Sequence, residues 1–598
     1  MYGFYGRMLH VELSTGTLLW RDLPENQLQS VLGGIGLGTR LLYEYAPSQV
    51  DPFAPENPLI FTSAPLVGTG LTTTAKFAVT TTSPLTGFIA DSLSSSFFAL
   101  ELKRTGLDAI VITGAAAAPV FLWITEDTVE IREATHLWGK SASDTETAIR
   151  EALGDREARV AAIGVAGEQR VRYATISNEG RHAGRGGVGA VMGAKNLKAI
   201  ALRGRMRANV ADPAGVEVIA DVLRQKSVST LTAKYREIGT VANLAVFNRL
   251  GVLPTRNFQQ STFAHVDALS GETLLTDSFS RAHGCASCTI RCERLFRSLN
   301  GEEQRLEYET LFALGPLCGI ESADAVLHAA QLCDLYGLDT ISTGGTIAWA
   351  MECAEKGLFP EAAALGLRFG NAAALFAAIH ALAKRNGVGA LLAEGSRRAA
   401  AHVGAEAEQL AMHVKGMELP GYEPRGLKSM ALGLAVSPRG ACHNRSGAYE
   451  ADFSGQADRL HADPRRGELV VAAEDFAAVL DSLIICKFLR RCFTDFYPEA
   501  AELLAKVTGW SYAADEVRRI GERINILKKL FNLRQGWQPQ DDWLPPRLLT
   551  EPLSTGMAQG TLLTSAELRE MIQAYYKARG WNEQGFVPEE KLKELHLW

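Results

Sequence analysis

The sequence predicts an α+β fold, in which an N-terminal β-rich domain is followed by two mainly α-helical domains. Short β-branched runs separated by Gly and Pro turns fill about the first third of the 598 residues. From about Met206 the chain changes to long Ala- and Leu-rich runs with helical periodicity, and Pro420, Pro424 and Gly426 mark a further break. The predicted domains are residues 1–205, 206–415 and 416–598.

The first domain is expected to contain short strands with few helices between them. The N-terminal residues 1–13 alternate in the way a strand does. A helix is expected around residues 96–102, where Leu and aromatic residues cluster ahead of Lys103 and Arg104. The other strands are expected at residues 59–62, 77–81, 109–112, 161–165 and 199–202.

The second and third domains are expected to be built mainly from helices. Apolar residues there recur with the helical period, and the segment that opens at Ser565 begins like a capped helix. The expected helices cover residues 323–336, 372–385, 474–489 and 565–580.

The composition is that of an ordinary globular protein, with 47% hydrophobic and 21% charged residues. A net charge of -6 offers no basic footprint for nucleic acid or an anionic membrane, so we expect neither partner. The N-terminus has no apolar signal segment, and the uncharged runs at residues 57–75 and 109–125 are broken by Pro and Gly. Because nine cysteines, an odd number, accompany this N-terminus, we expect a reducing compartment and a cytoplasmic protein.

A glycine-rich turn at residues 184–189 matches the G-x-G-x-x-G pattern of dinucleotide-binding proteins. A strand-like run, residues 170–176, precedes it, and a short helix could follow. A full NAD site is not predicted, because the next strand follows after barely two helical turns and ends in Arg203-Gly204-Arg205, where an acidic residue is needed. The turn with Arg185 beside it predicts an anion-binding loop, and a simple tight turn is the alternative.

Three cysteines near the middle of the chain, Cys285, Cys288 and Cys292, have the spacing C-x2-C-x3-C. Thiolate ligands select zinc, Cu(I) or an iron–sulfur cluster, and three thiols on one loop with a distant fourth commonly hold a cluster. A zinc knuckle needs a second close Cys or His pair, and none follows, although His283 is adjacent. We therefore favour a cluster, with a zinc-stabilised scaffold protein as the alternative from another functional class.

The other six cysteines supply the candidates for a fourth thiol ligand. Three lie in apolar, helical-looking runs, where a free cysteine is commonly a small core residue, namely Cys318, Cys333 and Cys353. Three have polar or charged neighbours and are better candidates, namely Cys442, Cys486 and Cys492.

Further short stretches are distributed over essentially the whole chain. They are Tyr5-Gly6-Arg7, residues 33–38, 83–87, 184–198, 253–258, 307–310 and 424–426, together with the cysteine triplet. Their content and order resemble one family, the tungsten-containing aldehyde:ferredoxin oxidoreductases. The shared order along the chain makes the resemblance highly specific.

The resemblance implies a tungsten bis-pterin centre enclosed between the β-rich domain and the two helical domains, with a 4Fe-4S cluster alongside. It implies two pterin motifs of the type D-x-x-G-L-D/C, matched by residues 334–339 and 481–486. Cys486 is then the fourth cluster ligand, Cys492 is a bystander, and Ile484 stands where the motif has Gly. The implied pterin contacts from the two motifs are Asp334, Leu338, Asp339, Asp481 and Ile485.

Other matched positions imply further pterin contacts in the first domain. Lys76 stands where Arg is common, which keeps the charge and loses the bidentate geometry. Ser95 falls at an expected contact, and Leu93 replaces a polar one. An intersubunit iron site is not expected, because His328 stands where an acidic ligand would be. The implied phosphate-binding loop consists of Ala183, Gly184 and Arg185, in agreement with the anion-binding interpretation.

Glu309 and His443 resemble the catalytic pair of the family. The resemblance implies that Glu309 helps to deprotonate water or an aldehyde hydrate, and that His443 hydrogen-bonds the reacting oxygen. The alternatives are a solvated helix carboxylate, with Glu307 as a competing base, and a structural histidine.

The expected function is oxidation of aldehydes to carboxylic acids, with electrons passing through the cluster to ferredoxin, a similar carrier or electron-transfer subunits. An aromatic acyl-CoA ring reductase of the same family is the alternative enzyme. The sequence does not separate tungsten from molybdenum, and it leaves the preferred aldehyde and a homo-oligomeric state open.

Overall fold

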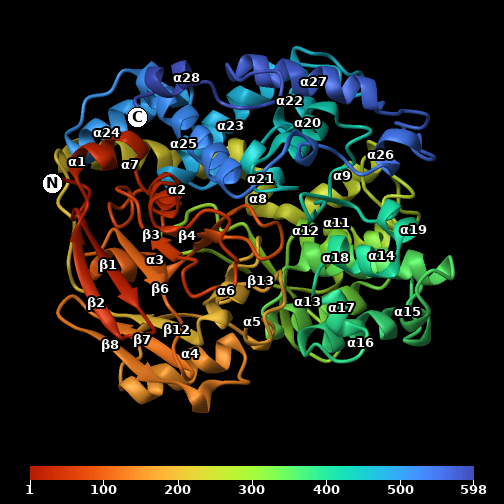
Figure 1. Ribbon diagram of the computed structural model, residues 1–598, viewed down its shortest axis with the longest axis horizontal. Helices are drawn as coiled ribbons and strands as arrows, with labels where there is room; N and C mark the ends of the chain where they lie inside the picture. Colours follow the sequence, from red (N-terminus) through yellow and green to blue (C-terminus); the bar gives the residue numbers. More distant parts are fainter. Residues whose placement is uncertain (598) are drawn as a thin grey trace.

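The computed structural model describes residues 1–597 and is a mixed α/β protein, with a β-rich N-terminal domain followed by helical domains (Figure 1). The first of two six-stranded sheets has the order β2-β1-β6-β3-β4-β5, in which only the β1–β6 pair is parallel. Its strands are β1 (Arg7–Glu12), β2 (Thr17–Asp22), β3 (Leu59–Thr62), β4 (Lys76–Thr82), β5 (Ile89–Ser95) and β6 (Ala109–Thr113).

The second sheet has the order β11-β10-β9-β12-β7-β8 and is antiparallel except for the β12–β7 pair. Its strands are β7 (Val120–Ile124), β8 (Val129–Glu133), β9 (Arg159–Ala162), β10 (Ile176–Asn178), β11 (Arg181–Ala183) and β12 (Leu197–Leu202). The helices of this domain include α2 (Gly34–Tyr45), α3 (Phe97–Arg104), α4 (Ala142–Leu153), α5 (Val165–Glu168) and α6 (Val188–Ala194).

The first sheet is buried on both faces, because successive side chains of a strand point to opposite sides. Leu59 and Phe61 of β3 share a core with the second sheet and α3, whereas Ile60 between them packs in the core that contains α2 and the helical domains. The same division separates Ile110 from Val111 in β6. Apolar residues therefore run almost continuously along the central strands.

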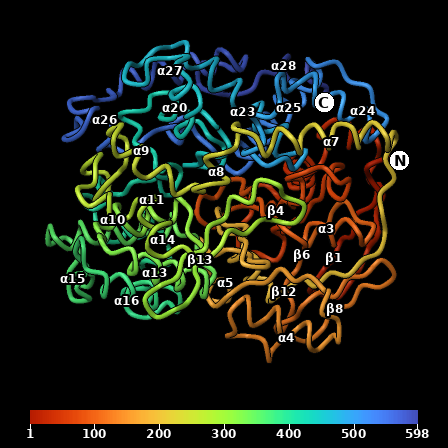
Figure 2. Tube along the Cα trace, turned by 180° about the vertical axis from the view of Figure 1, so that it is seen from behind, coloured from red at the N-terminus to blue at the C-terminus, as the bar shows by residue number. Residues whose placement is uncertain are grey.

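The helical domains surround the remaining side of the first sheet (Figures 1 and 2). The middle region also contains a small three-stranded sheet that the sequence did not predict, made of β13 (Phe279–His283), β14 (Glu293–Arg297) and β15 (Glu303–Leu306). The middle helices include α7 (Pro213–Ser227), α8 (Ala233–Glu237), α9 (Asn243–Arg249), α12 (Tyr308–Leu314), α13 (Ala323–Tyr336), α14 (Thr340–Glu355), α16 (Ala372–Ala383) and α18 (Ser396–Val403).

The C-terminal helices form a layer across the top of the view in Figure 1. They include α20 (Lys428–Val436), α21 (His443–Ser446), α22 (Tyr449–Phe453), α23 (Arg466–Ser482), α24 (Phe496–Thr508), α25 (Ala514–Arg534) and α27 (Ser565–Ala578). Within residues 1–597 no single helix is long and apolar enough to cross a membrane, and the one helix pair that passes by length and composition is bent by 117°.

Most of the expected elements are confirmed, and three are wrong in extent. Strand β9 ends at Ala162, and α5 takes over from Val165. The helix expected at residues 474–489 begins earlier, at Arg466, and ends at Ser482. Of the strand expected at residues 170–176, only Ile176 is in a strand, as the first residue of β10. Residues 170–175 are turns and irregular backbone, which bonds in part to distant segments, for example from Thr175 N to the carbonyl of Gly337.

A buried ion-pair cluster fastens α27 to α23. Arg579, just after α27, donates to Glu474 (2.7 Å) and Asp475 (2.5 Å) of α23, and Tyr575 also donates to Glu474 (2.6 Å). Arg579 is fully buried, so its loss leaves two carboxylates without their cation in the protein interior.

We predict that Arg579→Met lowers the free energy of unfolding by about 3 to 5 kcal/mol. Calorimetric or urea unfolding of the purified variants measures this change. Arg569→Met on the exposed side of α27 is the matched control and is expected to stay within about 0.5 kcal/mol of the parent. Equal stability of the two variants would contradict the role of Arg579.

Candidate active site and metal centre

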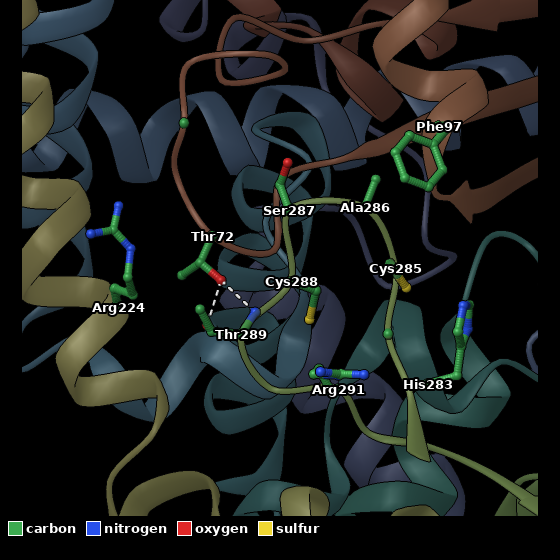
Figure 3. Close-up of a pocket in the computed structure, with 12 residues that line it drawn as sticks. Thr72, Phe97, Arg224, His283, Cys285, Ala286, Ser287, Cys288, Thr289 and Arg291 are labelled. Carbon is green, nitrogen blue, oxygen red and sulfur yellow. Dashed lines mark hydrogen bonds between the residues drawn. The ribbon is translucent and has the colours of Figure 1, made fainter. Parts of the chain in front are cut away.

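The cysteine triplet lies on the loop between β13 and β14 (Figure 3). The loop turns sharply: Cys288 N donates to the carbonyl of Cys285 (3.2 Å), and Ser287 and Arg291 have φ values of 55° and 49°. Residues other than Gly are uncommon in this left-handed region, and such conformations concentrate at functional sites. The turn gathers the thiols on a short stretch of backbone.

The segment at Thr72 and Thr73 joins the triplet loop to Cys486. Thr72 Oγ1 accepts from Thr289 N (3.1 Å), as the dashed line in Figure 3 shows, and Thr73 N donates to the carbonyl of Ser287 (3.1 Å). The carbonyl of Thr73 in turn accepts from Cys486 N (3.2 Å). One strand connection of the first domain therefore holds both cysteine segments beside each other.

The four predicted ligand thiols are electrostatic neighbours. The pKa of Cys292 lies well above its ordinary value, first because of burial and then because of Cys486, Glu307, Cys288 and Cys285. Among residues 1–597, no three His, Cys, Asp or Glu side chains stand close enough to hold one metal ion.

Two first-domain residues predicted to contact the pterin lie beside these thiols. Ser95 Oγ is 3.1 Å from Cys285 Sγ. Burial lowers the pKa of Lys76, but Cys486, Asp481 and Cys285 raise it more, so the ammonium form is favoured. Lys76 is therefore a cation shared by the two predicted cofactor sites.

The two D-x-x-G-L-D/C stretches are the same structure, a helix C-terminus closed by a Schellman turn. After α13, Gly337 has φ 76° and Leu338 N donates to the carbonyl of Cys333 (2.9 Å). After α23, Ile484 has φ 65° and Ile485 N donates to the carbonyl of Leu480 (3.0 Å). Sequence positions that match in the motif thus match in backbone geometry.

Ile484 adopts the left-handed conformation in spite of its branched side chain. This conformation costs about 1 to 2 kcal/mol for a residue other than Gly. The side chain is fully buried against Ala64 and Val67, and this packing offsets the strain. The substitution therefore changes the side chain at this turn and leaves its backbone path like that at Gly337.

The motif carboxylates are held by cations. Asp339 caps α14 through Ile341 N (3.2 Å) and Ser342 N (3.3 Å) and accepts from Arg185 Nε (3.1 Å). Asp481 accepts from Arg445 (2.8 Å).

Asp334 is the third of these carboxylates. It accepts from Gln304 (2.8 Å), and its Oδ1 is 3.1 Å from His182 Nε2. Burial raises the pKa of Asp334, but His182, Arg305 and Gln304 lower it by more, so that the pKa is about 2. All three motif carboxylates thus have basic or amide partners, which suits buried carboxylates.

Arg185 is bound mainly by the protein itself. Besides Asp339, its guanidinium donates to the carbonyls of Ala441 (2.6 Å) and Glu418 (2.7 Å). Arg185 follows Ala183 at the end of β11, and the turn requires glycine at position 187, where φ is 74° and a Cβ would lie 2.1 Å from the carbonyl of Arg172. The predicted clamp residue therefore also ties the turn to the helical domains.

A cavity of about 380 Å³ brings most of the predicted site together. Three predicted residues do not line it. Ala183 and Ile485 are buried, and each is next in sequence to a residue of the lining. Cys288 lines a neighbouring surface depression. The predicted residues that line the cavity are Lys76, Ser95, Gly184, Arg185, Cys285, Cys292, Glu309, Asp334, Leu338, Asp339, His443, Asp481 and Cys486.

Sequence reasoning missed the cations that make this cavity positive. Two of them retain unused donors, since Lys487 Nζ and Arg439 Nε are buried without a hydrogen-bond partner. Burial lowers the pKa of Lys487 to about 8, and Arg445 contributes to the lowering. The missed cations of the lining are Arg181, Arg305, Arg439, Arg445 and Lys487. A signal for these cations was present in the sequence, because Arg439, His443 and Arg445 lie within one short stretch.

Asp91 of β5 anchors two of these cations. It is fully buried and receives Arg445 Nε (2.8 Å), Lys528 Nζ (2.6 Å) and, more distantly, Arg439 (3.3 Å). Burial raises the pKa of Asp91, but Arg445, Lys528 and Arg439 lower it more, to well below the ordinary value. The carboxylate stays ionised and fixes the arginines at the cavity wall.

Glu309 and His443 face each other in the cavity. Glu309 Oε1 lies 3.6 Å from His443 Nδ1, which is too long for a hydrogen bond, and both atoms are buried without a hydrogen-bond partner. The other carboxylate oxygen of Glu309 accepts from Gly421 N (2.9 Å). An oxygen atom beside this gap can contact both unpaired atoms.

Burial shifts the pKa of both side chains towards their neutral forms. It raises the pKa of Glu309 to about 7, although Gly421 N–H and Arg185 oppose the shift. Burial, with Arg185, Lys487, Arg439 and Arg445, holds the pKa of His443 well below 6.5. Asn444 Nδ2 is 2.9 Å from His443 Nε2, and since an amide nitrogen only donates, the imidazole proton is on Nδ1.

Two family models cover almost the whole chain. The N-terminal domain of aldehyde ferredoxin oxidoreductase matches residues 8–204, and domains 2 and 3 match residues 217–597. The chain belongs to the aldehyde ferredoxin oxidoreductase family. The tungsten-containing aldehyde ferredoxin oxidoreductases of Pyrococcus abyssi and Pyrococcus horikoshii are each 40% identical to it, over 100% of this chain and 99% of theirs.

A solved structure has the same fold. The active-site complex of benzoyl coenzyme A reductase with 1,5-dienoyl-CoA superposes with a TM-score of 0.86 at 26% identity. The match covers 100% of this chain and 97% of that one. Membership of the family shows that the chain has the fold of an aldehyde ferredoxin oxidoreductase. Tungsten is part of the name of both Pyrococcus relatives.

We predict that Cys288→Ser lowers the iron bound per chain, because a cluster of this kind is held by four thiolates. Iron and acid-labile sulfide, measured on protein purified without oxygen, report the loss. Cys492→Ala is the matched control, because Cys492 lies only six positions from Cys486 and is not a predicted ligand. This variant is expected to keep about four irons per chain. An unchanged iron content in Cys288→Ser would remove this thiol from the ligand set.

Proposed function

We propose that the protein oxidises aldehydes to carboxylic acids and passes the electrons to ferredoxin or a similar carrier. The observation that carries the proposal is the Glu309–His443 pair, whose unpaired atoms lie 3.6 Å apart where two cavities meet. The reaction takes one oxygen from water and releases two protons and two electrons. The full-length identity of 40% to aldehyde ferredoxin oxidoreductases supports the same reaction class.

The residues that line the first cavity fit a bis-pterin centre. The cavity of about 380 Å³ is rich in cations, and Lys487 Nζ and Arg439 Nε point to an anionic group that would accept their hydrogen bonds. The residues proposed to hold the pterin are Lys76, Ser95, Ala183, Gly184, Arg185, Asp334, Leu338, Asp339, Asp481 and Ile485.

The residues proposed to hold a 4Fe-4S cluster are Cys285, Cys288, Cys292 and Cys486. When bound, tungsten or molybdenum supplies a two-electron acceptor, and the cluster supplies a one-electron route to the carrier. Lys76, beside Cys486 and Cys285, compensates thiolate charge between the two groups.

Glu309 acts as the general base. Its unpaired Oε1 takes a proton from the water or aldehyde hydrate that provides the new oxygen, while Gly421 N–H holds the other carboxylate oxygen in place. Neutral His443 donates its Nδ1–H to the substrate oxygen and orients the carbonyl. Stacking on Tyr422, with ring centroids 5.3 Å apart, keeps the imidazole plane fixed.

We predict that Glu309→Gln lowers kcat by about 10²- to 10⁴-fold and leaves the tungsten and iron contents unchanged. The amide has the shape of the carboxylate but cannot accept the proton. Turnover with a viologen dye and metal analysis of the same sample measure the two effects. Glu307→Gln is the matched control for the neighbouring carboxylate, and full activity of Glu309→Gln would refute the proposed base.

We also predict a pH dependence set by Glu309. Only the ionised carboxylate accepts a proton, and its pKa is about 7, so kcat/KM rises with pH through about 7 and levels off above it. Below about pH 6, kcat/KM is expected to fall about tenfold per pH unit. A profile that stays flat from about pH 5 to 8 would contradict the assignment.

Ring reduction of an aromatic acyl-CoA is the second candidate, favoured by the structural likeness to the benzoyl coenzyme A reductase complex. The two reactions separate in viologen assays: aldehydes reduce an oxidised viologen, whereas benzoyl-CoA consumes electrons from a reduced one.

Metal analysis tests the zinc-stabilised scaffold as well, because zinc without iron, tungsten or molybdenum would overturn both redox functions.

A further inference from the structure

A second cavity, of about 450 Å³, continues from the first and is called here the aromatic vestibule. Glu307, Glu309, His443, Asn444 and Phe488 line both cavities, so the vestibule opens onto the Glu309–His443 gap. Its walls are largely aromatic and include Tyr235, Phe247, Tyr422, Tyr449 and Phe453 as well as Phe488.

The aromatic side chains support one another. Tyr235 stacks on Phe488 with centroids 4.1 Å apart, and Phe247 stacks on Phe453 at 5.2 Å. Tyr422 lies between His443 and Tyr449, stacked on both within 5.3 Å. Rigid, mutually packed aromatic walls of this kind favour a rigid aryl ligand over a flexible chain.

Three cations lie at the outer part of the vestibule: Lys234, Arg490 and Arg491. Arg491 is 65% exposed, so this is the end that opens to solvent. Glu450 is the carboxylate paired there, with Arg490 and, at 3.6 Å, with Arg491. Three positive charges share one negative charge, and this leaves the rim positive.

The rim also keeps donor capacity. Arg490 Nε is buried without a hydrogen-bond partner. Burial lowers the pKa of Lys234, the like charges of Arg491 and Arg490 lower it further by repulsion, and Glu450 opposes them. A bound anion would relieve this repulsion and accept the unused hydrogen bond.

We propose that the preferred substrates are aryl aldehydes that carry a carboxylate remote from the aldehyde group. The aldehyde lies at Glu309 and His443, the ring lies between the stacked aromatic walls, and the carboxylate meets Lys234, Arg490 and Arg491 at the rim. This inference rests on the proposed aldehyde oxidation and specifies its substrate class. The remote carboxylate takes no part in the reaction.

The vestibule is continuous between the two ends. Glu309 and Tyr449 line it together with the rim cations Lys234, Arg490 and Arg491. The same cavity therefore reaches from the rim cations to the proposed base. An aryl ring with substituents at opposite positions can present one substituent at each end.

The test compares two acids, 4-formylbenzoate and 3-(4-formylphenyl)propanoate, with their primary amides, which have the same shape and no charge. We expect kcat/KM to favour at least one acid over its amide by about fivefold or more, mainly through KM, and the preference to shrink at high salt. In the double variant Lys234→Gln/Arg491→Gln the ratio is expected to approach one. Arg205→Gln removes a charge from an Arg that is 85% exposed elsewhere and should leave the ratio unchanged.

The outcomes separate this inference from the proposed function. If the amides are oxidised but neither acid is preferred over its amide, the substrate class is wrong and aldehyde oxidation stands. A preference that survives in the double variant also overturns the inference, because the rim cations would not be its source. If no aldehyde of the set is oxidised, the proposed function fails and the inference fails with it.

Discussion

The buried ion cluster around Asp91 is the interaction on which the site depends. Its carboxylate lies on β5, the strand at one edge of the first sheet, and its partners Arg445 and Lys528 come from α21 and α25 of the C-terminal domain. Burying one carboxylate in the interior is costly unless cations and hydrogen bonds surround it. Since Arg445 also binds Asp481, the same cluster connects the sheet to the end of α23, from which the chain continues to Cys486.

The site itself is assembled from helix ends and loops rather than from helix interiors. The Schellman turns after α13 and α23 place Asp339 and Cys486 at equivalent positions, although one follows a glycine and the other an isoleucine. Rigid helix termini of this kind hold side chains more precisely than long loops. The segment at Thr73 then joins the triplet loop to Cys486 by backbone hydrogen bonds, which do not depend on side-chain identity.

Several buried polar atoms of the candidate site have no hydrogen-bond partner. Most buried polar groups of this protein are paired, as for Asp334 and Asp339, whereas Glu309 Oε1, His443 Nδ1, Lys487 Nζ and Arg439 Nε are not. An unsatisfied buried group costs free energy in the folded state, and ligands or water repay this cost. The side chains that carry these four atoms line one cavity, which meets the aromatic vestibule at Glu309 and His443.

The sequence by itself determined that a β-rich region precedes the helical regions, and it determined the spacing of the cysteine triplet and the two helix-end motifs. Each of these features depends on neighbours within a few residues. It also marked Glu309 and His443, but only through resemblance to a family. The tertiary structure decided what lies around them: the convergence of Arg181, Arg305 and Lys487 on one cavity, and the 3.6 Å gap between two side chains from distant helices. It also decided that residues 170–175 are turns and irregular backbone, since Arg172 N and Thr175 N bond to the distant carbonyls of Ala393 and Gly337. Such contacts depend on how packed elements meet in space, and no local pattern of residues encodes them.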